Sequence, residues 1–394
     1  MKLDIFTEIQ RRACAENGGF LGLLEDSLAQ ARAADEAGFS CWWQVEHHCT
    51  PDFSYSSCPE MILQEVARAT TRLRVGHAGV LSPFQINHPL RAAERAALLD
   101  NLSGGRLELG LAKSGGKEWQ TFGVTEAQAA ADLVEATRLI PKAWTETPFS
   151  WCSDRFRVED REVLPKPLQQ PHPPLWHTCS SPPSFVRAGE LGVGVLATTL
   201  FAPLSQLAEM MKGYRQAVAA CAAPAGAFVN NQVGVFTFVH AAESDKAAVE
   251  SGAPQAALWY VSSAPRVFNV PRDIFYAAIR GSTDPRSAGS ISALEQAEQP
   301  DQSDVDDPNP VVALLKREFA GEEISNEEIF EVIRHLDSVI IGSVDTCRKK
   351  MAGFRDIGVD RLMCLVQMGA VPQNEILSSI RRIGAELLPE FARD

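Results

Sequence analysis

Three consecutive residues, Glu46, His47 and His48, have the side chains most suited to acid–base chemistry in this sequence. A histidine titrates near neutral pH, and a neighbouring carboxylate can orient its ring or share its proton. Adjacent side chains of an extended strand point to opposite faces, and no HxH or HExxH pattern is present, so no metal site is predicted. We predict that one histidine works as an acid or base in a pocket. A histidine hydrogen-bonded in a purely structural role is the alternative.

Two turns rich in glycine or serine are candidates for holding an anion. The first is the Lys-Ser-Gly-Gly turn that begins at Lys113, and the second places Ser180, Ser181 and Ser184 ahead of a predicted helix. Exposed N–H groups in such turns and at helix N-termini favour a phosphate group. A serine that only caps its helix, or a lysine that only pairs at the surface, is the alternative for each turn alone. Because the turns follow successive predicted strands, together they indicate an anion site.

The segment 88–116 shows how such residues are positioned. Apolar residues at three- and four-residue spacings predict a helix in its first half. The sequence Asn-Leu-Ser-Gly-Gly at 101–105 ends that helix, since glycine adopts the positive φ that is common at a helix C-terminus. A short strand with leucines at 107, 109 and 111 then leads to the Lys113 turn. Helix, strand and polar turn therefore form one α/β unit.

The same α/β unit recurs along the whole chain. We predict eight strands, at residues 3–9, 41–45, 72–81, 106–111, 175–179, 194–199, 232–240 and 361–367. Eight strand and helix pairs in one alternation favour a closed (β/α)8 TIM barrel over an open sheet, and no GxGxxG pattern follows the first strand. The site of such a barrel lies at the C-terminal ends of its strands, where Glu8, the 46–48 segment and both anion turns fall.

Two insertions interrupt this alternation. Prolines and alternating side chains in 151–170 predict a short hairpin excursion. Residues 281–310, between the seventh and eighth strands, are rich in Ser, Asp, Pro and Gly and are expected to be mobile without a ligand. Apart from these insertions, we expect residues 1–394 to form a single domain.

Length and composition limit the class of protein. The 394 residues are 45% hydrophobic and 22% charged, which is enough to bury a large core. A net charge of -13 without any basic run argues against nucleic-acid binding. Neither a membrane-length apolar run nor a signal-peptide pattern is present, so a cytoplasmic location without membrane attachment is expected. The nine cysteines are scattered and odd in number, which predicts neither a disulfide framework nor a zinc site.

Several longer motifs occur in a characteristic order. They are Glu-His-His at 46–48, A-x-x-T-x-R-L-R-V-G at 67–76, H-P-L-R-x-A-E at 88–94, L-D-x-L-S-x-G-R-L-E-L-G at 99–110 and Phe-Gly at 122–123. As a set, these motifs resemble those of the bacterial luciferase-like flavin monooxygenases. The sequence C-L-V-Q-M-G at 364–369 is most similar to family members from natural-product biosynthesis. The likeness covers most of the chain and is weakest over 151–171 and 243–336.

The resemblance implies a function and its partners. It implies a barrel that binds reduced FMN (FMNH2), receives it from a separate flavin reductase, and uses O2 to oxidise a small organic or natural-product intermediate through a flavin hydroperoxide or peroxide. Family members are typically homodimers packed through the second and third helices. The insert 281–310 falls where the family carries a lid that closes over the flavin and keeps water away.

The resemblance also implies roles for individual residues. His47 corresponds to the reactive histidine of the family, with Glu46 and His48 beside it. The positions that match cofactor-binding positions or adjoin them are Ala78, Gly79, Lys113, Ser180, Ser181 and Ser184. Among these, the lysine and the serines are expected at the FMN phosphate. The Ala-Gly pair is expected to run under the isoalloxazine ring, often with a non-proline cis peptide bond.

Two other functions stay open for the same barrel. One is an F420-dependent oxidoreductase that transfers hydride, although the long acidic tail of F420 calls for more basic residues at the rim than the sequence offers. The other is a non-catalytic flavin-binding protein, although such relatives tend to have lost barrel elements that this chain retains. Ala112 stands where light-emitting members carry a cysteine, which argues against luminescence. The FMNH2-dependent monooxygenase is the leading prediction.

Overall fold

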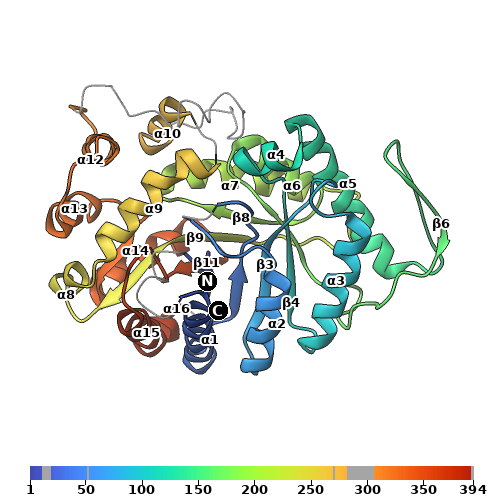
Figure 1. Cartoon of the computed structure of the whole chain (residues 1–394), viewed down its shortest axis with the longest axis horizontal. Coiled ribbons are helices and arrows are strands. Elements are labelled where there is room, and N and C mark those ends of the chain that lie inside the picture. Colours follow the sequence, from blue (N-terminus) through green and yellow to red (C-terminus); the bar gives the residue numbers. More distant parts are fainter. Residues whose placement is uncertain (11–18, 51–52, 269–270, 282–305, 392–394) are drawn as a thin grey trace.

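The computed structural model describes residues 1–10, 19–50, 53–268, 271–281 and 306–391 (Figure 1). Residues 282–305, which make up most of the predicted lid, lie outside the described residues. Within the described part of the chain, no helix is long and apolar enough to cross a membrane.

Eight parallel strands close into a barrel, as the sequence predicts. Their order around the barrel is β1, β2, β3, β4, β7, β8, β9 and β11, and the ring closes where β11 pairs with β1. The bounds are β1 Lys2–Thr7, β2 Cys41–Gln44, β3 Arg74–Leu81, β4 Leu107–Ala112, β7 Leu175–Thr178, β8 Gly194–Thr198, β9 Val233–Ala242 and β11 Arg361–Leu365. The predicted fold class, a (β/α)8 TIM barrel, is therefore confirmed.

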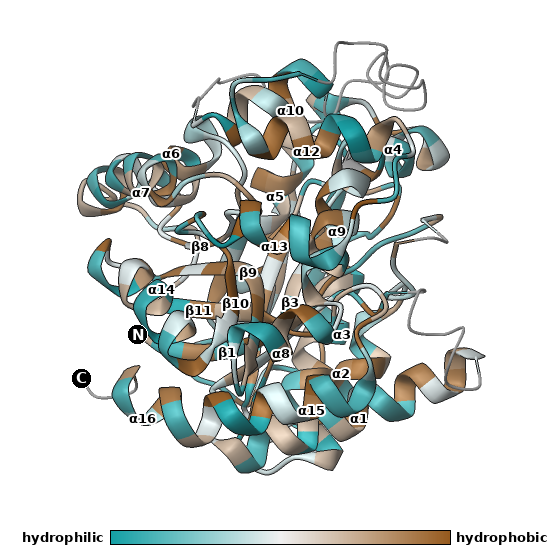
Figure 2. Ribbon diagram, turned by 90° about the vertical axis from the view of Figure 1, so that its left-hand side faces the viewer, coloured by the Kyte–Doolittle hydropathy of each residue, from teal (hydrophilic) through white to brown (hydrophobic). Residues whose placement is uncertain are grey.

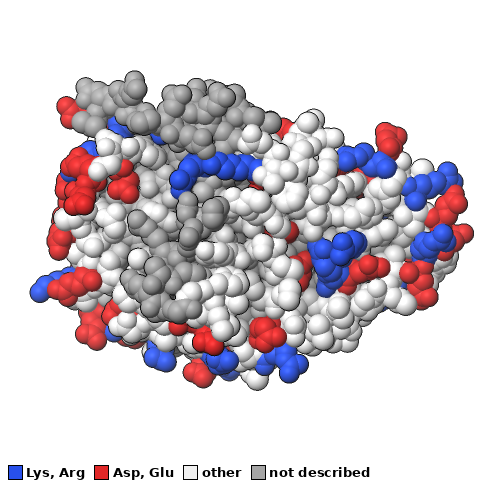
Figure 3. Space-filling model, in the orientation of Figure 1, with Lys and Arg blue, Asp and Glu red and all other residues white. Residues whose placement is uncertain are grey.

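Helices surround the barrel and turn their apolar faces towards it. Figure 2 shows this pattern, with hydrophobic residues concentrated on the strands and hydrophilic ones on the outer sides of the helices. The helices that connect the barrel strands, or follow the last one, are α1 Gly19–Ala37, α2 Pro59–Ala69, α3 Pro89–Leu102, α5 Glu126–Thr145, α6 Pro182–Glu190, α7 Leu204–Ala219, α14 Val344–Asp356, α15 Gln373–Arg382 and α16 Leu388–Phe391, with a π-helical turn at Ile383–Leu387. On the face drawn in Figure 3, basic side chains are scattered and most lie beside acidic ones.

Local sequence signals explain the ends of α3. His88 accepts a hydrogen bond from the backbone N–H of Leu90 through its Nδ1, at 3.3 Å, and proline occupies the first turn, where its missing N–H has no cost. After the helix, Gly104 and Gly105 have φ values of 69° and 78°. Glycine adopts such angles without strain, so the chain reverses into β4 as the sequence predicts.

Three features were not part of the predicted barrel, or refine the prediction. The strand β10 (Ile340–Ser343) pairs in parallel with the end of β9, outside the closed ring. The hairpin predicted at 151–170 is formed by β5 (Phe149–Cys152) and β6 (Arg157–Arg161), so it begins slightly earlier. A short helix, α4 (Gly116–Phe122), follows the Lys113 turn. This helix brings a further carboxylate, that of Glu118, to the barrel mouth.

The segment between β9 and β10 forms its own group of helices. They are α8 Asp245–Glu250, α9 Ala253–Phe268, α10 Arg272–Ile279, α12 Pro310–Phe319 and α13 Asn326–Ile333. These helices lie together at one side of the barrel (Figure 1), and α9 contacts α12, α13 and also α4. The segment therefore packs against the same short helix that follows the Lys113 turn.

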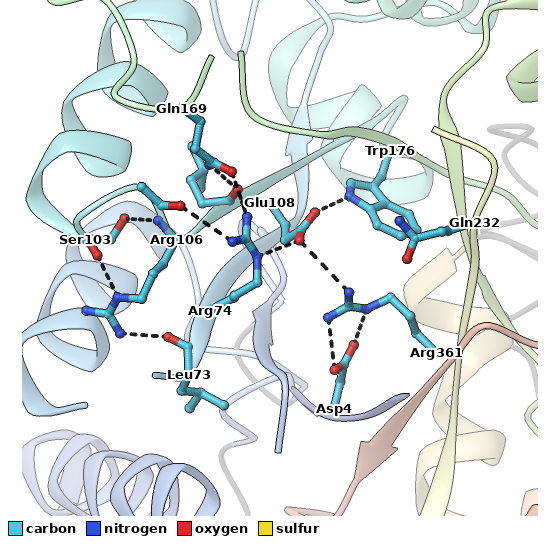
Figure 4. A network of polar contacts seen from close by, with 12 residues as sticks. Asp4, Leu73, Arg74, Ser103, Arg106, Glu108, Gln169, Trp176, Gln232 and Arg361 are labelled. Carbon is cyan, nitrogen blue, oxygen red and sulfur yellow. Dashed lines mark hydrogen bonds and ion pairs between the residues drawn. The ribbon is translucent and has the colours of Figure 1, made fainter. Parts of the chain in front are cut away.

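A buried ionic network holds the N-terminal end of the barrel together (Figure 4). Arg361 donates hydrogen bonds to both carboxylate oxygens of Asp4, at 2.6 and 3.1 Å, and both side chains are almost fully buried. Arg74 donates to Glu108 at 2.7 Å. Because these residues start β1, β3, β4 and β11, the network links four strands. A charge buried in this way is strongly destabilising if its partner is removed, which marks this end as structural.

Large and small residues alternate inside the barrel above this network. Trp43 and Trp176 meet edge to face with their ring centroids 5.5 Å apart. A Cβ atom at Gly76 would lie 2.2 Å from the Trp43 ring, and one at Gly194 would lie 2.4 Å from the Trp176 ring. The two glycines therefore make room for the two indoles, and the barrel is a packed core with its functional end on the opposite side.

Candidate active site

Glu46 and His48 form one pair at the mouth of the barrel. Glu46 is buried directly after β2 and accepts hydrogen bonds from the backbone N–H of Leu81 and from Asn87 Nδ2, both at 2.9 Å. Its Oε1 lies 3.0 Å from His48 Nε2. This hydrogen bond raises the pKa of His48, and partial burial opposes it. Glu46 is thus anchored to the end of β3 and orients His48.

His47 lies between two other carboxylates. Its Nδ1 is 3.3 Å from Glu118 Oε1, and its Nε2 is 3.5 Å from Glu8 Oε2. Glu8 follows β1, and Glu118 belongs to α4. Glu118 is itself held, because it accepts hydrogen bonds from the backbone N–H of His48 at 2.7 Å and from Ser114 Oγ at 2.5 Å. The two adjacent histidines therefore face different carboxylates, which accords with the expected divergence of their side chains.

The carboxylates change the proton affinity of the site. Burial alone lowers the pKa of His47, but the hydrogen bond and charge of Glu118 and the charges of Glu8 and Glu46 raise it to about 9. Burial raises the pKa of Glu118 in turn, yet its contacts with His47, together with the hydrogen bonds from Ser114 and the backbone of His48, outweigh this and lower it. Near neutral pH, His47 is consequently a proton donor, whereas an isolated histidine would be mostly neutral.

Aromatic side chains close the space around this group. Tyr260, from α9, donates a hydrogen bond to Glu8 Oε1 at 2.8 Å. The Phe53 ring lies 5.0 Å from that of Tyr260 and 5.9 Å from that of His47, measured between centroids. Both Phe53 and Tyr260 are buried. They shield the charged group from water and so strengthen its electrostatic interactions.

The predicted flavin-ring positions, Ala78 and Gly79, lie near the C-terminal end of β3. The peptide bond between them is cis. A Cβ atom at Gly79 would lie 2.7 Å from the backbone carbon of Gly110 in β4. Only glycine fits there, because β3 and β4 approach each other this closely where their register shifts.

The serine turn after β7 is largely satisfied by its own hydrogen bonds. Ser184 Oγ accepts hydrogen bonds from the N–H groups of Ser180 and Ser181, at 3.2 and 3.0 Å, and donates to Ser181 O at 2.7 Å. Prolines occupy the first two positions of α6 and have no N–H to offer. A phosphate at this turn would therefore be bound mainly by the serine hydroxyls, with fewer backbone donors than a serine-rich helix N-terminus suggests.

Lys113 lies in the turn after β4, the strand that pairs with β7. Its ammonium group is 4.0 Å from Glu126 and 5.6 Å from the centre of the Trp119 ring, and the side chain is about 29% exposed. Burial lowers the pKa of Lys113, and Glu126 opposes this. Pairing of β4 with β7 brings the lysine turn and the serine turn to adjacent places on the rim, as the order of the predicted strands requires.

Some of the buried polar atoms that lack a hydrogen-bond partner among the described residues lie just after the C-terminal ends of barrel strands. They are Glu8 Oε2 and Gln10 Nε2 after β1, Thr199 Oγ1 after β8 and Gln367 Nε2 after β11. Such atoms are costly to bury alone. Their presence at one end of the barrel fits a polar ligand such as a flavin ring, which has both hydrogen-bond donors and acceptors. In the described ranges, no three or more His, Cys, Asp or Glu side chains are arranged to hold a metal ion.

The structure adds Glu8, Glu118 and Tyr260 to the residues predicted from sequence. Glu8 was placed at the strand end without a role. Glu118 lies in a short helix that no periodicity revealed, and Tyr260 is distant in sequence from every motif. A strand-end position was thus the one usable signal, and it applied to Glu8 alone.

A closed barrel with buried acid–base residues at the C-terminal ends of its strands is the arrangement of TIM-barrel enzymes. The chain can also be assigned to one family within this large class of enzymes. This chain belongs to the luciferase-like monooxygenase family, because the family model of that description matches residues 1–361.

Relatives and solved structures agree with this assignment. The oxygenase component of flavin-dependent trigonelline monooxygenase from Acinetobacter baylyi is 26% identical over 220 residues, which cover 55% of this chain and 59% of that protein. The first curated relatives are matched over about half of their length, from 49% to 59%.

Among solved structures, the monooxygenase RslO1 from Streptomyces bottropensis superposes with a TM-score of 0.73 at 22% identity, over 99% of this chain and 100% of that one. The oxygenating constituent of 3,6-diketocamphane monooxygenase from Pseudomonas putida, in complex with FMN, superposes with a TM-score of 0.69 at 16% identity. The match covers 99% of this chain and 98% of that one. An F420-dependent secondary alcohol dehydrogenase superposes with a TM-score of 0.66 at 15% identity, over 100% of this chain and 99% of that one. At these identities the likeness concerns the fold.

Proposed function

We propose that this protein is a monooxygenase that uses FMNH2 and O2 to oxidise a small organic molecule. The observation that carries the proposal is the buried, charged group around His47 at the barrel mouth, in a chain of the luciferase-like monooxygenase family. Reduced FMN would supply the electrons that activate O2, while the protein supplies binding, orientation and protons. A natural-product intermediate is the substrate class that the 364–369 motif favours.

The proposed roles of the residues follow from their places at the rim. The phosphate of FMN would be bound by Lys113 with the hydroxyls of Ser180, Ser181 and Ser184. The isoalloxazine ring would lie along the backbone of Ala78 and Gly79. The acid–base work would fall to His47, with His48 and Glu46 as the second pair.

Two partners complete the proposal. A separate flavin reductase would supply FMNH2, in line with the relative from Acinetobacter baylyi, which is named an oxygenase component. A second copy of the chain would pack against α2 and α3, where Met61, Leu98 and Leu102 are 69%, 50% and 54% exposed. We propose a cytoplasmic location on the composition alone.

Labelled oxygen tests the proposed reaction. The protein is mixed with chemically reduced FMN under heavy-isotope O2 and a panel of small ketones, phenols and heteroaromatic compounds, and products are identified by mass. We expect one heavy oxygen atom in a product, and none when His47 is replaced by Asn. If the His47→Asn protein forms labelled products as fast as the wild type, the proposed acid–base role of His47 is wrong. If no product of the wild-type protein contains heavy oxygen, the proposed reaction is contradicted.

The alternative is hydride transfer with F420, favoured by the likeness of the barrel to an F420-dependent dehydrogenase. Anaerobic titration with reduced FMN and with reduced F420 separates the two. Binding of reduced F420 alone would exclude the monooxygenase. Binding of flavin without any turnover, unchanged by His47→Ala, would indicate a non-catalytic flavin-binding protein.

A further inference from the structure

Glu8 is a buried carboxylate with only one of its two oxygens in a hydrogen bond to the described residues. It is 1% exposed, and its Oε1 accepts the hydrogen bond from Tyr260. Its Oε2 has no hydrogen-bond partner among the described residues and lies 3.5 Å from His47 Nε2. A buried carboxylate with one unsatisfied oxygen lowers stability, and groups of this kind concentrate at functional sites.

We propose that Glu8 is a positioning residue that keeps a transferable proton on Nε2 of His47, while Tyr260 fixes the carboxylate from α9. The inference deepens the proposed function and rests on it for the acceptor, which is the substrate or cofactor bound in the barrel mouth. Neither Glu8 nor Tyr260 belongs to the motifs that define the family likeness.

Each of the two carboxylates around His47 faces a different nitrogen of its ring. Glu118 faces Nδ1, and Glu8 faces Nε2. Because Glu118 is held by Ser114 and by the backbone of His48, it fixes the ring and retains the Nδ1 proton. The contact of Nε2 with Glu8 is the longer of the two, at 3.5 Å against 3.3 Å, and it does not meet hydrogen-bond geometry, so the proton on Nε2 is the more easily released.

The proton balance is simple. In the proposed resting state, His47 carries protons on both nitrogens, and Glu8 and Glu118 are ionised even though burial raises the pKa of Glu8. When the bound acceptor takes the Nε2 proton, that N–H bond breaks and its electron pair stays on the ring. His47 is then neutral, with its Nδ1 proton still directed to Glu118. A hydrated proton from the solvent restores Nε2 at the end of the cycle, and no electrons are exchanged.

Charges from several elements act on His47 and Glu8. Among the described residues, the titratable groups that act on them are Glu8 after β1, Glu46 and His48 after β2, Glu118 in α4 and Tyr260 in α9. Burial has the largest effect on Glu8 and leaves its pKa above the ordinary value, while the charge of His47 and the hydrogen bond from Tyr260 oppose this rise. Tyr260 thereby helps to keep Glu8 ionised, which is what holds the proton on His47.

The tyrosine links this pair to a distant segment. Tyr260 is fully buried, and α9 packs against α4, the helix that carries Glu118. The Phe53 ring lies against both Tyr260 and His47. Any displacement of α9 would therefore change the Glu8 to His47 distance and the exposure of the pair to water.

Histidine NMR tests the inference without any flavin. The intact protein is labelled with carbon-13 histidine, the His47 signal is assigned from the His47→Asn variant, and its pKa is measured by pH titration. In Glu8→Gln, which preserves size and can still accept from Tyr260, we expect the pKa of His47 to fall by about 1 unit. In Tyr260→Phe we expect a smaller fall in the same direction, because Glu8 becomes harder to ionise.

Matched controls separate this role from general destabilisation. Glu108→Gln removes a buried carboxylate at the other end of the barrel, where Glu108 pairs with Arg74. Tyr214→Phe removes a buried tyrosine hydroxyl that donates to backbone carbonyls of Val193 and Asn230. Both are expected to lower Tm and to leave the pKa of His47 unchanged.

The pKa of His47 in these variants decides whether Glu8 is a positioning residue. An unchanged His47 pKa in folded Glu8→Gln and Tyr260→Phe overturns the inference, as does an equal fall in the two controls. If Glu8→Gln does not fold, Tyr260→Phe carries the test alone. Once a substrate is known, the alkaline limb of the rate profile should move to lower pH in Glu8→Gln. Since the titration needs no cofactor, a failed monooxygenase assay would leave this result standing, and the reverse also holds.

Discussion

Replacement of Glu118 by Gln probes the electrostatics of the site most sharply. Glu118 contributes a hydrogen bond and a charge to His47, whose pKa is about 9 in the folded protein against an ordinary value of 6.5. A difference of this size corresponds to roughly 3 kcal/mol at 1.36 kcal/mol for each unit. Glu118 makes the largest contribution to raising the pKa of His47. The Glu118→Gln variant should therefore lose on the order of 1–2 kcal/mol of this stabilisation of the charged histidine.

The pH window follows from the direction of the shift. A histidine with a raised pKa in the folded state contributes stability that is fully present below its unfolded pKa and is lost as pH rises through the folded value. The free energy of unfolding should therefore fall between about pH 6.5 and pH 9 in the wild type. In Glu118→Gln this fall should be smaller by roughly 1–2 kcal/mol.

Urea unfolding at a series of pH values measures this difference. Far-UV circular dichroism follows the transition, and Glu146→Gln serves as the control, since Glu146 is an exposed carboxylate near the end of α5. Identical pH slopes for the wild type and Glu118→Gln would refute the account of His47 as a charged residue held by Glu118. A parallel change in the control would point to a general effect of net charge.

Three further predictions use the rest of the barrel. Lys113→Ala should weaken the binding of FMNH2 about tenfold, as expected for loss of one charge-assisted phosphate contact; unchanged affinity in an anaerobic fluorescence titration would place the phosphate elsewhere. Gly79→Ala should lower stability by roughly 1–3 kcal/mol, because the new Cβ would lie 2.7 Å from the Gly110 backbone, and an unaltered Tm would contradict the close approach of β3 and β4. Arg361→Met should cost about 3–5 kcal/mol by leaving Asp4 buried and unpaired, so soluble protein with wild-type Tm would argue against the structural role of that pair.

The barrel itself was predictable because its signals are local and repeated. Alternation of strands and helices, glycines after α3 and apolar strands each have a short-range cause, so their sum identified eight strands and their order. The extra strand β10 escaped prediction because four residues carry too little pattern. The short α4 escaped for a similar reason, since glycine-rich turns surround it.

The site was predictable only in part. His47, His48 and Glu46 could be named because they follow one strand. Their partners Glu118 and Tyr260 could not, because the contacts join positions 71 residues apart in the first case and 252 residues apart in the bond between Tyr260 and Glu8. The internal hydrogen bonds of the serine turn also depend on side-chain geometry, which the order of residues does not specify.

Anaerobic titration of the purified protein with FMNH2, beside an identical titration with reduced F420, tests the central claim most directly. We predict saturable binding of FMNH2, weakened in Lys113→Ala, and no binding of reduced F420 over the same range. Saturable binding of reduced F420 without binding of FMNH2 would contradict it.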